Sequence, residues 1–282
     1  MRYGRAPHEV VVVTGTGGMG IAIARRLGTG RHLVLAEYAK ESLAAAAQVL
    51  AGEGHWVHQV PVDISDAAAV KDLAAQAAGF GRIRAVVHTA GVSPVQANPA
   101  RIVAVDVIGT ALLLDAFEQY AEPGTVMVCI ASMAGSMTPL PPGVEALLAT
   151  TPTNQLAGLP LLDPATIDPA AAYGIAKRAN QVRVQAASVA WGKRGGRVVS
   201  LSPGIISTPM GQQELAGPSG DMMRHMIDTS ATQRLGTPED IASAVEFLVS
   251  PAASFITGTD LLIDGGVVAA LRYGSRPRPS RR

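Results

Sequence analysis

Short runs of consecutive Val, Ile and Leu residues recur along the chain, and amphipathic stretches separate them. The runs predict seven strands, at residues 9–14, 31–36, 56–62, 83–89, 124–131, 196–202 and 260–263. The stretches between them predict helices near residues 18–28, 39–53, 65–79, 99–120, 170–193 and 238–249. Apolar runs without polar alternation are typical of parallel strands that are covered on both faces. The alternation therefore predicts an α/β fold with a doubly wound, seven-stranded parallel sheet.

Two long segments interrupt this alternation. Residues 134–168 are rich in proline and have one short apolar patch, and residues 205–233 hold several glycines and methionines. Long irregular stretches inside a compact domain are usually functional loops or lids. We therefore expect an insertion at 134–168, a substrate lid at 205–233, and one domain over residues 1–271.

Composition narrows the class of protein. Of the 282 residues, 48% are hydrophobic and 16% charged, and the net charge is +1, which argues against disorder and against coating a nucleic acid. Residues 272–282 carry five arginines and no acid, and we expect a disordered, solvated tail there. No apolar run approaches the ~18–20 residues that cross a bilayer, so a cytoplasmic protein without a membrane span is expected. The single cysteine, Cys129, excludes an intrachain disulfide, and its apolar surroundings predict a buried, inert thiol.

A glycine-rich turn connects the first predicted strand to the first helix. Its cofactor-binding candidates are Gly15, Gly17, Gly18, Met19 and Gly20, which fit the pattern G-x-G-x-x-G. Glycines let a backbone approach a pyrophosphate closely, and a helix N-terminus offers it free N–H groups. The turn therefore predicts a dinucleotide site. The alternative is that these glycines only make a tight turn.

Two acidic residues follow the second and third strands. Glu37 comes 22 positions after Gly15, where a carboxylate accepts hydrogen bonds from the adenosine ribose and repels a 2′-phosphate, which favours NAD over NADP. Asp63, with its neighbour Ile64, is placed to reach the adenine. The alternatives are that Glu37 only begins a helix and that Asp63 shares a helix cap with Ser65.

The segment "YGIAK" places Tyr173 and Lys177 four positions apart, although the chain has only five tyrosines and four lysines. Residues at this spacing share one face of a helix. An ammonium group near a phenol favours the phenolate and lowers its pKa. We therefore predict an acidified tyrosine that exchanges a proton with an alcohol or a ketone.

Further motifs carry a resemblance to a known family. "HTAG" follows the fourth strand, "IASMAG" ends the fifth, and "SPGIISTPM" ends the sixth. Together with the glycine turn and the Tyr–Lys pair, they resemble the short-chain dehydrogenase/reductase family, in its single-domain branch, over roughly residues 9–268. The resemblance implies a Rossmann-type fold and an oxidoreductase that uses NAD or NADP.

The resemblance also implies roles for individual residues. Ser132 would hydrogen-bond the substrate oxygen, Tyr173 would exchange the proton, and Lys177 would lower the pKa of that phenol and hold the nicotinamide ribose. The further implied cofactor contacts are Ala90, Gly91, Pro203, Gly204, Ile206 and Thr208. His88 replaces the family's first asparagine and is expected to be structural, and no residue spacing indicates a metal site.

Three features depart from the family. The turn from Thr14 to Gly20 is one residue shorter than usual. Asp106 replaces an asparagine of the family's proton relay, and its charge would alter the pKa balance with Lys177. Ser132 and Tyr173 are unusually far apart because of the insertion, which resembles that of bacterial 3α-hydroxysteroid dehydrogenase/carbonyl reductases. There it covers a dimerisation face, so a homo-oligomer, a dimer or tetramer, is expected with the insertion as a lid or an interface element.

The apolar residues of the two interrupting segments suggest the substrate. The insertion offers leucines such as Leu148 and Leu156, and the lid offers Met210, Met222, Met223 and Met226. We expect a small apolar secondary alcohol or ketone, steroid-like, terpenoid or aliphatic. The alternative is that these residues only pack against each other. Other functions for the same fold are a non-catalytic NAD(H) sensor, a 3-oxoacyl thioester reductase and a sugar-nucleotide epimerase or dehydratase.

Overall fold

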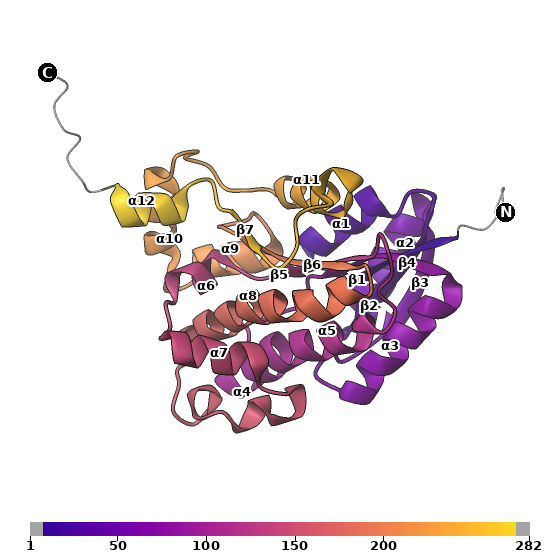
Figure 1. Cartoon of the computed structure of the whole chain (residues 1–282). Coiled ribbons are helices and arrows are strands. Elements are labelled where there is room, and N and C mark those ends of the chain that lie inside the picture. Colours follow the sequence, from indigo (N-terminus) through magenta and orange to yellow (C-terminus); the bar gives the residue numbers. More distant parts are fainter. Residues whose placement is uncertain (1–7, 275–282) are drawn as a thin grey trace, which may run out of the picture.

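A seven-stranded sheet lies at the centre of the computed structural model, which describes residues 8–274 (Figure 1). All neighbouring strands are parallel, and their order is β3-β2-β1-β4-β5-β6-β7. This confirms the predicted Rossmann-type, doubly wound fold. The strands are β1 (Glu9–Thr14), β2 (His32–Glu37), β3 (Trp56–Pro61), β4 (Arg82–His88), β5 (Val126–Ile130), β6 (Arg197–Pro203) and β7 (Asp260–Ile263).

The apolar runs fill two cores, one on each face of the sheet. In β1, Val11 and Val13 belong to one core and Val10 and Val12 to the other, because successive side chains of a strand point to opposite faces. The first core also contains residues of α1 (Gly18–Leu27), α2 (Lys40–Gly52) and α11 (Pro238–Val249). The second contains residues of α3 (Ala67–Phe80), α5 (Thr110–Glu118) and α8 (Pro169–Lys193).

The helix predicted near 99–120 is not a single regular helix. It begins as α4 (Pro99–Ile102), widens into a π-helical stretch at Val103–Gly109, and continues as α5. Short π-helical stretches inside α-helices occur frequently at functional sites. Here the wide stretch contains Asp106, which is 1% exposed.

The insertion at 134–168 is mostly helical rather than irregular. It contains most of α6 (Met133–Met137), then α7 (Pro142–Thr150) and two 3₁₀ turns at Thr153–Gly158 and Pro160–Leu162. Its buried leucines form a third core with α8 and the π-helical stretch: Leu148, Leu156 and Leu162. Figure 1 shows α7 lying along α8. The sequence pattern missed these helices because prolines at their first turns resembled loop signals.

The predicted lid also contains two helices, α9 (Pro209–Ala216) and α10 (Gly220–Thr229). Met223 and Met226 pack in a fourth small core, whereas Met222 is exposed. The last helix, α12 (Val267–Tyr273), lies beside α10 (Figure 1). Arg272 belongs to α12, so the predicted disordered tail is wrong at its start, while residues 275–282 lie outside the described residues. A 3₁₀ turn at Pro251–Ala253 precedes β7.

Cys129 is the fourth of the five residues of β5, an interior strand of the sheet between β4 and β6. Its side chain is fully buried, and burial raises the pKa of its thiol to about 12. The prediction of a buried thiol is confirmed. Within residues 8–274, no helix is both long and apolar enough to cross a membrane.

The packing of the insertion yields a stability prediction. Leu156 is 0% exposed, so Leu156→Ala leaves a cavity in the third core and should lower the free energy of unfolding by about 2–5 kcal/mol. Leu147, in the same insertion, is 51% exposed, and Leu147→Ala should change it by only about 0.5 kcal/mol. Urea unfolding of both variants measures the difference. An equally small decrease in the free energy of unfolding for both variants would show that Leu156 is not part of a folded core.

Candidate active site

A cleft of about 410 Å³ lies at the carboxyl edge of the sheet. It opens where β1 is flanked by β2 and β4, the point at which the strand order reverses and at which sheets of this kind bind ligands. Eleven of the predicted cofactor residues line it: Gly15, Gly17, Gly18, Met19, Gly20, Glu37, Asp63, Ile64, Ala90, Gly91 and Thr208. The cleft therefore unites segments from five separate parts of the chain.

The glycines of the turn have different reasons for lacking a side chain. Gly15 has φ +87°, and a Cβ on it would lie 2.7 Å from the Ala90 nitrogen, while one on Gly20 would lie 2.0 Å from the Gly15 oxygen. A Cβ on Gly17 would meet nothing within 4 Å. Packing thus explains Gly15 and Gly20 but not Gly17, which lines the cleft and is the N-cap of α1. No side chain caps this helix, so its first N–H groups suit a phosphate.

Glu37 is held firmly at the end of β2. One carboxylate oxygen, Oε2, accepts hydrogen bonds from the Thr16 N–H at 2.9 Å and from the Thr16 hydroxyl at 3.2 Å. The other, Oε1, accepts from the backbone N–H groups of Tyr38 and Ala39, just before α2. The carboxylate therefore satisfies backbone N–H groups just before α2, which agrees with the alternative that Glu37 begins a helix. It also lines the cleft.

One arginine of the cleft lining, Arg101, was not identified from the sequence and lies beside Asp63. Arg101 forms an ion pair with Asp63 at 3.1 Å, and its guanidinium carbon is 5.4 Å from the centre of the Tyr38 ring. Asp63 also accepts hydrogen bonds from Ser65, but the cap of α3 is Asp66. Arg101 comes from α4, far from β3 in sequence, so only the folded chain brings the two together.

The predicted catalytic residues lie together: Ser132 just after the carboxyl end of β5, and Tyr173 and Lys177 on α8. Ser132 is the N-cap of α6, and its hydroxyl accepts a hydrogen bond from the Ala134 N–H at 3.1 Å. Its hydroxyl lies close enough to the Tyr173 phenol to lower the pKa of that phenol. The Lys177 Nζ lies 5.2 Å from the centre of the Tyr173 ring. The expected neighbourhood of serine, tyrosine and lysine is therefore present.

Asp106 meets Lys177 in the interior. Their ion pair measures 3.1 Å between Nζ and Oδ2, with side-chain exposures of 7% and 0%. The other oxygen, Oδ1, accepts a hydrogen bond from the Val92 N–H at 2.9 Å. Burial raises the pKa of the Asp106 carboxyl, and Lys177 opposes that rise. For Lys177, burial lowers the pKa, but Asp106 and the phenol outweigh burial, so it lies above its ordinary value.

The predicted acidification of Tyr173 is wrong for the chain's own residues. Burial raises the pKa of its phenol above the ordinary value, and Lys177 only partly offsets that rise. The negative charges of Asp106 and Glu214 raise the pKa of the phenol further, while the nearby Ser132 hydroxyl lowers it. The sequence shows the nearby cation but not the burial of Tyr173, which adds the cost of desolvating a phenolate.

Glu214 is a second residue that the sequence analysis missed. It lies on α9 of the lid and is half-buried, and burial raises the pKa of its carboxyl, while the nearby Ser93 hydroxyl and the charge of Lys177 oppose this rise. Within residues 8–274, Glu214 forms no ion pair. The side chain of Gln213, its neighbour, accepts a hydrogen bond from Gln96, a cleft residue. The lid therefore places a carboxylate near Tyr173 and Lys177.

Other predicted residues lie outside the cleft. Gly204 and Ile206 line a separate cavity of about 200 Å³, and Pro203 ends β6 in the interior. His88 is buried and bridges the hydroxyls of Thr14 and Thr110, and burial lowers its pKa to about 3. Its structural role agrees with the sequence analysis. Among the described residues, no group of three or more His, Cys, Asp or Glu side chains forms a candidate metal site.

Two family models match the chain. The model described as short chain dehydrogenase matches residues 9–141, and the one described as enoyl-(acyl carrier protein) reductase matches residues 164–268. The gap between them, residues 142–163, falls within the insertion.

Similar proteins share nearly the full length. A short-chain dehydrogenase/reductase named bsc3 from Alternaria brassicicola is 37% identical over 265 residues, which cover 93% of this chain and 97% of the relative. The 3-alpha-hydroxysteroid dehydrogenase/carbonyl reductase of Comamonas testosteroni is 29% identical over 81% of this chain and 93% of its own. A solved short-chain dehydrogenase/reductase from Brucella melitensis is 27% identical, with a TM-score of 0.73 over 93% of this chain and 97% of its own.

The charges around Tyr173 yield a prediction about its titration. Asp106→Asn removes an anion that raises the pKa of the phenol, so the pKa should fall. Ultraviolet absorbance of tyrosinate, taken as a difference from Tyr173→Phe, measures this pKa. Asp72→Asn removes an acid from the exposed face of α3 and should leave it unchanged. An unchanged pKa in Asp106→Asn would contradict the electrostatic role of this carboxylate.

Proposed function

Because the chain belongs to the short-chain dehydrogenase/reductase family, we propose that it interconverts a secondary alcohol and a ketone with NAD or NADP. The observation that carries this proposal is the neighbourhood of Ser132, Tyr173 and Lys177 beside a cleft with an uncapped helix N-terminus. The nicotinamide ring, when bound, supplies or takes the hydride. The chain's own residues supply the proton and the site for the substrate oxygen.

In the proposed reduction, the Tyr173 hydroxyl donates its proton to the substrate oxygen as negative charge develops there. The Ser132 hydroxyl donates a hydrogen bond to the same oxygen. The Lys177 ammonium, held by Asp106, stabilises the phenolate that remains. Since the pKa of Tyr173 lies above its ordinary value, the phenol carries its proton at neutral pH, and the charge of Lys177 lowers the cost of releasing that proton.

An NAD-preferring enzyme is our proposal for the cofactor. The Glu37 carboxylate has its orientation fixed by four hydrogen bonds and lines the cleft where an adenosine ribose would lie. A fixed negative charge there repels a 2′-phosphate. Arg101 does not cancel this charge, since it is paired with Asp63. The predicted contacts of Pro203, Gly204 and Ile206 with the cofactor remain proposals.

We propose an apolar body for the substrate, steroid-like, terpenoid or aliphatic. The support comes from Met210, Val92 and Val105, which line the cleft. The leucines of the insertion give no support, because Leu148 and Leu156 are packed inside the third core. We therefore propose that the insertion is an interface element or a structural support rather than a substrate lid. A homo-oligomer and a cytoplasmic location stay predictions.

A polyhydroxylated substrate is the second candidate. The half-buried carboxylate of Glu214, close to the buried Ser93 hydroxyl, would accept a hydrogen bond from a second hydroxyl group. Relatives named D-threitol dehydrogenase and galactitol 2-dehydrogenase, 32% and 28% identical, belong to this class. A 3-oxoacyl thioester reductase and a non-catalytic NAD(H) sensor remain alternatives, although retention of both Tyr173 and Lys177 disfavours the sensor.

The enzymatic proposal is tested by nicotinamide absorbance with pairs of ketones that share a carbon skeleton and differ by one hydroxyl group next to the carbonyl. Native protein should reduce at least one pair member, and Tyr173→Phe should lower kcat about 10²–10⁴-fold, since it removes the proton donor. Preference for the hydroxylated member would favour the second candidate. Tyr120→Phe, outside the cleft, is the matched control. Cofactor binding without turnover of any ketone would favour the sensor.

The cofactor proposal is tested by thermal shift. NAD should raise the melting temperature of native protein more than NADP does at equal concentration, because Glu37 repels the extra phosphate. Glu37→Gln should narrow that difference, since it removes the charge and keeps the side-chain length. Glu41→Gln, an acid on the exposed face of α2, should leave it unchanged. A larger shift with NADP in native protein would overturn the proposed preference.

A further inference from the structure

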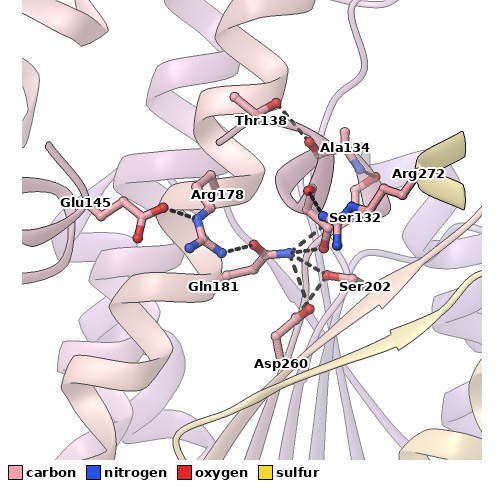
Figure 2. Close-up of polar contacts among 10 residues, drawn as sticks. Ser132, Ala134, Thr138, Glu145, Arg178, Gln181, Ser202, Asp260 and Arg272 are labelled. Carbon is pink, nitrogen blue, oxygen red and sulfur yellow. Dashed lines mark hydrogen bonds and ion pairs between the residues drawn. The ribbon is translucent and has the colours of Figure 1, made fainter. Parts of the chain in front are cut away.

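A network of polar side chains lies beneath the segment that carries Ser132, and Figure 2 shows its members. At its centre is Gln181 of α8, which is 1% exposed. Its amide nitrogen donates to the Ser202 hydroxyl at 2.9 Å and approaches Asp260 Oδ2 at 3.3 Å. It also lies 3.3 Å from the Ser136 hydroxyl and 3.5 Å from the Ser132 carbonyl oxygen.

The position of Gln181 follows from the helix. Tyr173, Lys177 and Gln181 are four residues apart, so they share the face of α8 that meets the ends of the strands. The helix thus presents the phenol, the ammonium and the amide in one row. The first two point to the reacting centre, and the third reaches the backbone of Ser132.

The orientation of the amide is determined on both sides. On its oxygen side, Arg178 Nη1 donates a hydrogen bond to Oε1 at 3.0 Å. On its nitrogen side stand only acceptors or hydroxyls, including the Asp260 carboxylate. A flipped amide would set its NH₂ against a guanidinium and its oxygen against a carboxylate. The chain therefore holds the NH₂ group toward the Ser132 segment.

Both ends of the network are anchored in separate parts of the chain. Arg178 forms an ion pair at 2.6 Å with Glu145, which lies on α7 of the insertion. On the other side, Asp260 of β7 accepts hydrogen bonds from Ser200 at 2.6 Å and Ser202 at 2.9 Å. The insertion and the edge strand are thereby connected through Gln181 to the catalytic serine's backbone.

The segment that follows Ser132 also packs tightly against α8. A Cβ on Gly135 would lie 2.8 Å from the Lys177 carbonyl carbon, so α6 lies directly on the helix backbone. Arg272 of α12 donates a hydrogen bond at 2.8 Å to the Ser136 carbonyl oxygen and closes the segment from outside. Small shifts of this segment would therefore change the position of the Ser132 hydroxyl relative to Tyr173.

We propose that Gln181 is a positioning residue that holds the Ser132–Ser136 segment at a fixed position relative to Tyr173. The insertion fixes the orientation of the Gln181 amide through Glu145 and Arg178. This inference rests on the proposed function. Gln181 does not touch the substrate; it acts through Ser132. A loss of positioning lowers the turnover rate more than it weakens substrate binding, since the serine is most important when charge develops on the substrate oxygen.

A double-mutant cycle tests the proposal with a ketone that native protein turns over. Gln181→Met keeps the side-chain length and removes the hydrogen bonds, and it should lower kcat about tenfold with KM within about twofold. Glu145→Gln should give a smaller loss in the same direction. In the Ser132→Ala background, Gln181→Met should lower kcat by less than about twofold, because the group that it positions is gone. Gln185→Met, the same change at an exposed site of α8, is the matched control.

Several outcomes would overturn the inference. A further tenfold loss in the Ser132→Ala background would mean that Gln181 acts independently of Ser132. A crystal structure of Gln181→Met with Ser132 in its native position, beside an undiminished kcat, would exclude the positioning role. Native protein that turns over no ketone would refute the proposed function and, with it, this inference. Turnover with an additive cycle would refute only the inference.

Discussion

Two buried charges, Lys177 and Asp106, meet between α8 and the π-helical stretch at a distance of 3.1 Å. Neither charge is stable in the interior alone, and loss of one partner of such a pair typically costs about 3–5 kcal/mol. The pair therefore fixes the spacing between the two helical segments. It also fixes the electrostatic environment of Tyr173, since each of the two charges acts on the phenol in the opposite sense.

The lid and the insertion, whose apolar residues both suggested contact with the substrate, have different positions in the structure. Residues at the carboxyl ends of β1 to β4 line the cleft, and the lid adds Met210 to this lining and places Glu214 near Tyr173. The insertion lies on the other side of α8, where its leucines complete a core. It reaches the catalytic residues through the Glu145–Arg178 pair and through this core, against which Tyr173 also packs.

The fold and most of the cleft could be predicted because they depend on local patterns. Valine runs and the glycine turn identify strands and a helix start wherever they occur. The pKa of Tyr173, the Asp63–Arg101 pair and the location of Glu214 could not be predicted, since each depends on burial or on segments that are distant in sequence. The helices of the insertion were missed because proline begins a helix as readily as it ends one.

The thiol of Cys129 has a practical consequence. It occupies the middle of the central sheet, and its high pKa leaves almost no thiolate in the folded state. An alkylating reagent can modify it only in molecules in which the core between the sheet and the helices α3, α5 and α8 has opened. Because no other cysteine exists in the chain, the rate of modification reports the opening of this core.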